Sequence, residues 1–338
     1  MLNKILAPLD GSVLADTVLP HIVALTRING TEVTLLHVLE TNQTAPAQMG
    51  PVNIDPVEWG LRKAEAQTYL TETANRLHQF DLPTENVVLE GRAAERIVEY
   101  AQKEDFDLVA LSTHGQGGLS GWNLSGVTSK VLHRIRKSTL IIPAHRAASR
   151  RQSQGELQPI QYRRILVPLD GSPRAECVLP LAMALARRHE AELILAHVVT
   201  PPEMIQRLPL TTEEQQLVDK FITRNQAEAT RYFEQLRTRL TPTPTIQILV
   251  DDDVERSLAN LIERESIDLM ILAAHGQSCR SGHAYGHFAE SFIEYGSVPL
   301  YLYQDLNVDE IAPLYAERML QDQEPPKHHM NTNDYAVK

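Results

Sequence analysis

Short apolar runs alternate with longer amphipathic segments along most of the chain. In the first half, apolar runs of strand length occupy residues 4–9, 32–38, 86–89, 108–112 and 139–142. Helical periodicity falls between them, over residues 13–28, 56–79, 93–103 and 124–137. This alternation predicts an α/β fold, in which helices cover both faces of an open parallel sheet through right-handed crossovers.

The second half repeats the first at an offset of about 160 residues. PLDGS occurs at 8–12 and again at 168–172, and DLVALSTHGQ at 107–116 returns as DLMILAAHGQ at 268–277. A period of this length indicates two tandem copies of one domain and excludes a solenoid repeat. In the second copy we expect a long helix near 212–240 and strands at 246–250, 269–273 and 299–303.

The repeat divides the chain into a first domain (1–143), a linker (144–162), a second domain (163–305) and a tail (306–338). The linker is polar and carries Arg146, Arg150 and Arg151. We interpret it as a solvated connector, with contact to an acidic partner or to lipid as the alternative. The tail begins with one candidate amphipathic helix, and its last residues have the composition of a disordered segment.

One proline interrupts the first predicted helix of each copy. Pro20 and Pro180 occupy equivalent positions. A proline inside a helix removes one backbone hydrogen bond and kinks the helix. Either this helix bends at the proline or it begins later than the periodicity indicates, and the sequence leaves both alternatives open.

Composition narrows the class of protein. The formal net charge is −11, with 43% hydrophobic and 22% charged residues, which is typical of a globular protein and argues against nucleic acid as a partner. Cys177 and Cys279 are the only cysteines, which fits a reducing compartment without disulfides. No apolar run approaches the roughly 18 residues of a membrane span, and the start of the chain lacks a secretory pattern. We therefore expect a cytoplasmic protein that does not insert into membranes.

Two segments of each copy fall beyond the carboxyl ends of predicted strands, where open parallel sheets bind ligands. The first is PLDGS, in which Asp10 can accept hydrogen bonds from a ribose or cap the next helix. The second is the glycine-rich loop 112–128, whose amides can bind an anion and whose Ser125 and Thr128 hydroxyls can contact phosphate. The alternative for this loop is a flexible connection.

Several established motifs are missing. The chain contains no GxxxxGK[ST], no GxGxxG after the first strand and no GxSxG. These absences argue against a P-loop protein, a dinucleotide-binding domain and an α/β-hydrolase.

One possible metal site occurs in the second copy. His275, Cys279, His283 and His287 are each four residues apart, a spacing that on one helix suits zinc. Glycines interrupt that helix, so we expect no metal. We expect Cys177 to be a core residue rather than a reactive thiol.

Both copies resemble universal stress protein domains, and the chain resembles a tandem member of that family. The resemblance rests on the first strand ending in PLDGS, the LLHV second strand and DLVALSTHG before the glycine-rich loop. It implies a five-stranded parallel sheet of order 3-2-1-4-5 in each copy, and a site for ATP or another adenine nucleotide, with Mg²⁺ as a further candidate. It also implies that the two copies pair as an intrachain pseudo-dimer through their fifth strands, and that the chain can form a homodimer.

The family's nucleotide motif, G-x2-G-x9-G-[ST], is altered in both copies. The first copy has Ser112, Gly115 and Ser125-Gly126, whereas the second has Ala273, Gly276 and Gly286-His287. The first copy therefore keeps more of the site, because a serine hydroxyl and a small residue remain where the second copy has histidine.

By position, the resemblance assigns nucleotide binding to two sets of residues. The set in the first copy is Pro8, Asp10, Val38, Leu111, Ser112, Gly115, Ser125, Gly126 and Val127. The set in the second copy is Asp170, Val198, Gly276, Gly286 and His287. Asp10 would meet the ribose, the Val38 backbone the adenine, and the loop amides the phosphates.

The resulting hypothesis is a non-catalytic stress-response protein that binds an adenine nucleotide as a sensor or regulator. A transporter or a kinase is the kind of protein partner that it would regulate. Two alternatives remain open. One is an interaction protein of the same fold that needs no nucleotide. The other is a slow ATPase, for which the sequence offers no general base near the loop beyond Asp10 and Asp170.

Overall fold

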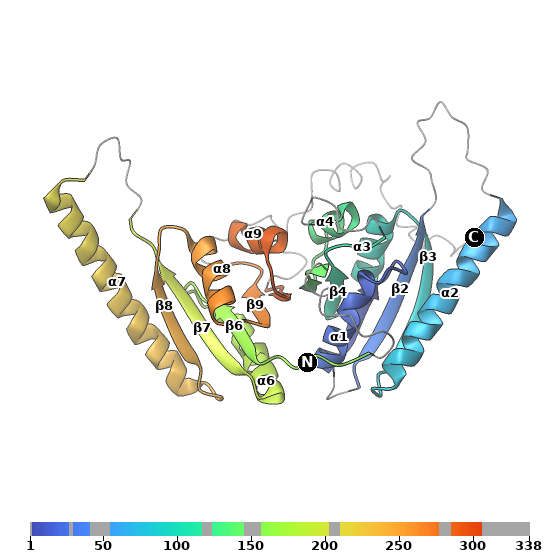
Figure 1. Ribbon diagram of the computed structural model, residues 1–338, viewed down its shortest axis with the longest axis horizontal. Coiled ribbons are helices and arrows are strands. Elements are labelled where there is room, and N and C mark those ends of the chain that lie inside the picture. The colour runs from blue at the N-terminus through green and yellow to red at the C-terminus, as the bar shows by residue number, and fades with distance from the viewer. Residues whose placement is uncertain are drawn as a thin grey trace, which may run out of the picture.

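Each half of the chain forms a five-stranded parallel sheet of order 3-2-1-4-5, as the resemblance implies (Figure 1). The computed structural model describes residues 2–26, 30–40, 55–116, 124–144, 157–202, 210–276 and 285–305. The first-half strands are β1 (Lys4–Pro8), β2 (Glu32–Glu40), β3 (Thr84–Gly91), β4 (Leu108–Ser112) and β5 (Ser138–Ile142). The second-half strands are β6 (Arg164–Pro168), β7 (Glu192–Val199), β8 (Thr245–Val250), β9 (Leu269–Ala273) and β10 (Leu300–Tyr303).

The two five-stranded sheets join into one. Strands β5 and β10 pair antiparallel, with Tyr301 opposite Leu140. The resulting ten-stranded sheet has the order β3-β2-β1-β4-β5-β10-β9-β6-β7-β8. The expected pairing of the two copies through their fifth strands is confirmed, and it relates the halves by an approximate two-fold axis.

Helices cover both faces of this sheet. One face carries α1 (Leu19–Thr26), α2 (Pro56–His78), α6 (Leu179–His189) and α7 (Thr212–Arg239). The other face carries α3 (Ala93–Lys103), α4 (Gly126–Leu132), α8 (Val254–Arg264) and α9 (His287–Tyr295). Neighbouring residues of a strand face opposite sides, so Ile5 packs into the first core and Leu6 into the second. Each core runs without a break through both halves.

The first helix of each half begins later than its periodicity indicates. Single 3₁₀ turns, η1 (Ala15–Val18) and η2 (Ala175–Val178), come first, and the α-helices start at Leu19 and Leu179. Pro20 and Pro180 are thus the second residues of their helices, where a backbone amide has no partner within the helix. Of the two alternatives left open by the sequence, the later start is correct.

The end of the linker belongs to the first core. Leu157 is 6% exposed and Tyr162 is fully buried, although both lie in a polar segment. The Tyr162 ring stacks on His21 of α1 and meets His189 of α6 edge-on, so one side chain contacts both halves. The expectation of a solvated connector is therefore wrong at Leu157 and Tyr162, although Gln158 and Gln161 between them are exposed. Residues 145–156 and the tail 306–338, with its predicted helix, lie outside the described residues.

Within the described ranges, no helix combines the length and the apolar character that a membrane crossing needs.

Candidate functional site

The loops that follow β1 and β4 meet at the carboxylate of Asp10. Its Oδ1 accepts a hydrogen bond from the Ser12 amide (3.0 Å), and its Oδ2 accepts one from the Gln116 amide (2.6 Å). The amide of Ala15, the first residue of the following 3₁₀ turn, donates instead to Ser12 Oγ (3.1 Å). Asp10 therefore bridges two neighbouring loops and does not cap a helix.

A side chain in place of the glycine beside this carboxylate would force the carboxylate to move. A Cβ atom built on Gly115 would lie 1.9 Å from Asp10 Oδ2, and one built on Gly276 would lie 2.3 Å from Asp170 Oδ2. Gly11 and Gly171 both adopt a φ of +83°, a left-handed conformation that glycine reaches without strain. The two halves thus build the same corner, in which a carboxylate approaches the backbone of the second loop.

The hydroxyls expected to contact phosphate are used inside the protein. Ser125 Oγ accepts from the Thr128 amide (3.1 Å) and so caps α4. The Thr128 hydroxyl is buried and donates to the Ser112 carbonyl (2.9 Å). The Thr128 hydroxyl is therefore directed into the protein in this structure. Gly126 and Val127, the first two residues of α4, are exposed.

The matching helix start in the second half lacks a side-chain cap. Gly286 precedes α9 and its amide donates to the Ala274 carbonyl (2.8 Å), as the Ser125 amide does to Thr113 (2.7 Å). His287 is exposed and stands where the first half has Gly126. The second half thus places an imidazole at the entrance of its helix.

The remaining predicted residues lie at strand ends. Pro8 ends β1, Ser112 ends β4, and Val38 lies in β2 beside β3, as Val198 does in β7 beside β8. Leu111 is 4% exposed and packs into the second core, so only its backbone can face a ligand. The structure therefore gathers the predicted set of each half at the carboxyl edge of its sheet.

A polar cluster beside β2 was not predicted from the sequence. The Tyr69 hydroxyl of α2 donates to the Asp16 carboxylate, and Arg76 Nη1 lies 2.8 Å from Asp16 Oδ2. Burial and the Asp16 carboxylate raise the pKa of Tyr69. Burial lowers the pKa of His37 in β2, although the Leu9 carbonyl and the Asp10 carboxylate act in the opposite direction. The second half keeps the tyrosine–carboxylate contact of this cluster, since Tyr232 donates to Glu176 (2.7 Å). Its repetition in both halves is the signal that could have found it.

Comparison with known proteins decides the family. The sequence model of the universal stress protein family matches residues 1–143 and, separately, residues 161–304. The chain belongs to this family.

Universal stress protein MJ0577 of Methanocaldococcus jannaschii is 27% identical over 156 residues, which is 42% of this chain and 95% of the relative. A solved universal stress protein from Archaeoglobus fulgidus covers 90% of this chain and 100% of its own, with 16% identity and a TM-score of 0.60. A universal stress protein crystallised with cAMP covers 44% of this chain and 100% of its own, with 16% identity and a TM-score of 0.31.

In this universal stress protein, the second half anchors its loop differently from the first. In the first half, Thr113 Oγ1 lies 3.0 Å from His114 Nδ1 and accepts from the Ala144 amide (3.0 Å). In the second half, His275 Nδ1 lies 2.8 Å from Asp305 Oδ1. The other oxygen of Asp305 lies 3.1 Å from Arg174, and the Asp305 side chain is 4% exposed.

Arg174 and Asp305 were not predicted from the sequence. Two complementary charges replace Leu14 and Ala144 of the first half, and that paired replacement was the available signal. His275 Nδ1 is thus held by Asp305. No group of three metal-ligating side chains occurs among the described residues, and Cys279 and His283 lie outside them.

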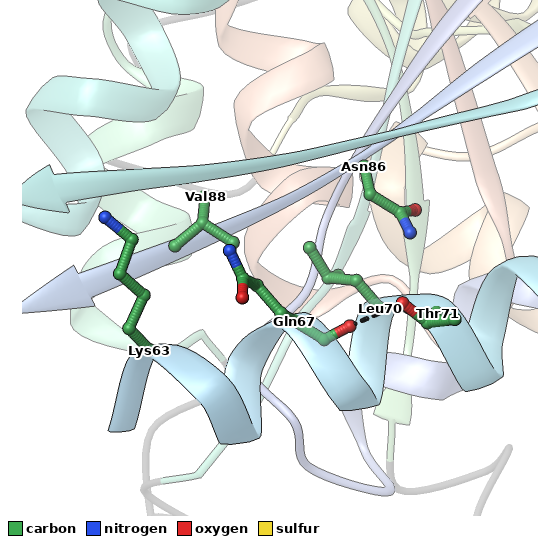
Figure 2. Close-up of a pocket in the computed structure, with 6 residues that line it drawn as sticks. All are labelled: Lys63, Gln67, Leu70, Thr71, Asn86 and Val88. Carbon is green, nitrogen blue, oxygen red and sulfur yellow. Dashed lines mark hydrogen bonds between the residues drawn. The ribbon is translucent and has the colours of Figure 1, made fainter. Parts of the chain in front are cut away.

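An open hollow of about 400 Å³ lies between α2 and the edge strand β3 (Figure 2). It is lined by Lys63, Gln67, Leu70, Thr71, Asn86 and Val88. None of the predicted site residues lines it. We therefore place the candidate site at the strand ends, where the repeated carboxylate and glycine meet, and not in this hollow.

Proposed function

We propose that this universal stress protein binds ATP or a related adenine nucleotide in its first half and acts as a non-catalytic sensor or regulator. The observation that carries the proposal is the meeting of Asp10 with the Gly115–Gln116 backbone. These groups flank the point between β1 and β4 where the strand order reverses, which is the usual ligand position in an open α/β sheet.

Binding would exchange hydrogen bonds at Asp10. Ribose hydroxyls would donate to the carboxylate in place of the Gln116 amide. The released amide, with those of the exposed Gly126 and Val127, would then face the phosphates. Any Mg²⁺ would reach the protein mainly through phosphate oxygens, because the described residues contain no ready-made metal cluster.

The second half is proposed as the weaker site. His287 stands at its helix start, and the contacts of Arg174 and His275 with Asp305 fix its loop. We therefore expect one nucleotide per chain. A cytoplasmic location, a regulated protein partner such as a transporter or kinase, and self-association belong to the same proposal.

One observation favours the nucleotide-independent interaction protein. The side chains of Asp10, Ser125 and Thr128 are all hydrogen-bonded within the protein, so the corner is complete without a ligand. The slow ATPase has no comparable support.

The test is a titration of the full chain, purified without added nucleotide, with ATP and separately with cAMP. Any molecule carried through purification is released by denaturation and identified by mass spectrometry. We expect one adenine nucleotide per chain, and Asp10→Ala should weaken binding about 10- to 100-fold, since a hydrogen bond to a charged group is lost. Circular dichroism checks that the variant is folded.

Asp170→Ala makes the same change in the second half. Unchanged affinity and stoichiometry would assign the site to the first half. If the wild-type chain carries no nucleotide and binds neither ligand, the interaction protein replaces this proposal. Phosphate release above background that disappears in Asp10→Ala would instead favour the ATPase.

A further inference from the structure

The two long helices each begin with a pair of exposed apolar side chains. In α2 the pair is Val57 (69% exposed) and Leu61 (61%), and in α7 it is Leu217 (66%) and Phe221 (43%). We call residues 55–65 the α2 tip and residues 211–224 the α7 tip. Both tips precede the first buried residue of their helix, which is Ala66 in α2 and Ala229 in α7.

The pairs occupy equivalent positions in the two copies. Val57 corresponds to Leu217 and Leu61 to Phe221, at the same offset that relates the two PLDGS segments. A single exposed leucine is ordinary on a protein surface. The same two positions kept apolar and exposed in both halves, although the residues themselves differ, indicate a surface that is used.

The tips are well-formed helix starts. Asp55 caps α2 by accepting from the Val57 amide (2.9 Å), and Pro56 follows at the first helical position. Thr211 and Glu214 form a capping box at α7, in which each side chain accepts from the backbone amide of the other. The apolar pairs are thus held on defined helical surfaces.

The two tips cannot meet within one chain. Helix α2 packs on β2 and β3, whereas α7 packs on β7 and β8, and these strand pairs lie at opposite ends of the ten-stranded sheet. Figure 1 shows both tips at the outer corners of the molecule, on the side of the sheet to which β2 runs. The two tips therefore do not cover each other within one chain.

The charges of the tips are compatible with a second copy as the partner. Both tips carry acidic residues in the first turn and basic residues further along, with the apolar pair among them. The acidic residues are Asp55 and Glu58 in α2, and Glu213 and Glu214 in α7. The basic residues beside and after the second apolar position are Arg62 and Lys63 in α2, and Lys220 and Arg224 in α7, with Glu65 and Asp219 among them. Within the chain, exposed ion pairs join Arg62 to Glu58, Lys63 to Glu90 and Arg224 to Glu228. Two such tips packed antiparallel place acidic starts against basic ends, with the apolar pairs between them.

We propose that the tips are the surface through which two copies of this chain associate, each tip packing antiparallel on a tip of the other copy. A second copy engages both tips at once, which strengthens two small contacts through their effective concentration. A partner with one binding face would use only one of them. The acidic first turns and the net charge of −11 oppose an anionic membrane.

The experiment measures the mass of the full-length chain by light scattering and sedimentation over a range of concentrations. Wild type should be dimeric. Leu61→Glu combined with Phe221→Glu should raise the dimer dissociation constant at least about 100-fold, because a charge would be buried in each contact. Thr68→Glu combined with Thr230→Glu is the matched control. It adds the same charges at exposed positions of the same helices and should stay dimeric.

A wild-type chain that is monomeric at every concentration, or a doubly substituted chain that stays dimeric, would overturn the proposal. The substituted side chains are exposed, so the double variant should unfold at the same temperature as wild type when both are compared as monomers. Adenine nucleotide binding per chain is measured on the same samples. It should not change, and this separates a failure of the dimer from a failure of the proposed nucleotide site.

Discussion

At the scale of single residues, the site depends on one close approach, that of the Asp10 carboxylate to the backbone at Gly115. The two amide donors to Asp10 fix its position from both sides. A larger side chain at position 115 must move this carboxylate, because its Cβ alone would lie only 1.9 Å from Oδ2, well inside van der Waals contact.

Replacing Gly115 with alanine should therefore lower the free energy of unfolding by about 1–3 kcal/mol, the usual cost of overpacking. The loss should shrink in an Asp10→Ala background, where no carboxylate stands in the way. Urea unfolding of the two single variants and the double variant measures this coupling.

Gly126→Ala is the control, since a Cβ there has nothing within 4 Å. Alanine is also the better helix former, so this change should be neutral or stabilising. Equal losses for Gly115→Ala with and without Asp10 would contradict the close approach.

Residues of this corner were predictable because they recur: Asp10, Gly115 and their partners in the second half stand in two copies of one motif. The internal use of Thr128 was not predictable. The sequence does not distinguish a threonine hydroxyl that faces a ligand from one that donates to a backbone carbonyl, as Thr128 does to Ser112. Which partner it finds depends on the position of β4 relative to α4.

At the scale of elements, strands were predicted closely because their apolar runs are short and sharply bounded, as at Leu108–Ser112. Helix ends were predicted less well. The segment 124–137 forms a helix only over Gly126–Leu132, because Ser125 supplies the cap and the chain turns after Leu132 toward β5. The buried linker end escaped prediction since Leu157, Ile160 and Tyr162 follow no helical or strand period.

The contribution of the buried linker end to stability can be tested at Tyr162. Tyr162→Ala should cost about 3–5 kcal/mol of unfolding free energy, as large aromatic truncations in a core do. Tyr162→Phe should cost about 1–2 kcal/mol, because His21 Nδ1 loses the hydroxyl 2.9 Å away while the ring packing is kept.

Urea unfolding of both variants and of wild type measures these losses of unfolding free energy. A Tyr162→Ala chain as stable as wild type would mean that residues 157–162 contribute nothing to the core.

At the scale of the whole molecule, the order of strands within each half followed from the family resemblance and not from periodicity. Hydrophobic patterns report which face of a strand is buried, but they do not report which strand lies beside it. The pairing of β5 with β10 was likewise expected from the resemblance and not from periodicity. In the sequence, Leu140 and Tyr301 are only apolar residues, and nothing marks them as partners.

Because each core runs through both halves, the chain should unfold as one unit. Phe233 of α7 is fully buried in the first core, which also contains Ile5 and Leu70 of the first half. Phe233→Ala should cost about 3–5 kcal/mol. Amides of β1 and β4 in the first half should lose protection from hydrogen exchange as much as those of β6 and β9.

Hydrogen exchange read by mass spectrometry on peptides from both halves measures this. Tyr295→Ala is a suitable control, because that side chain is 71% exposed. First-half amides that keep wild-type protection in Phe233→Ala would show that the halves unfold independently.

The antiparallel junction of β5 with β10 has a consequence for abundance. Two separate domains that met through these strands would part on dilution, so their pairing would follow the amount of protein in the cell. Here the covalent connection holds the two fifth strands at a fixed local concentration, whatever the expression level. One half always has the other beside it in a one-to-one ratio. Each half is thereby free to diverge, as the unlike loops around His114 and His275 have done.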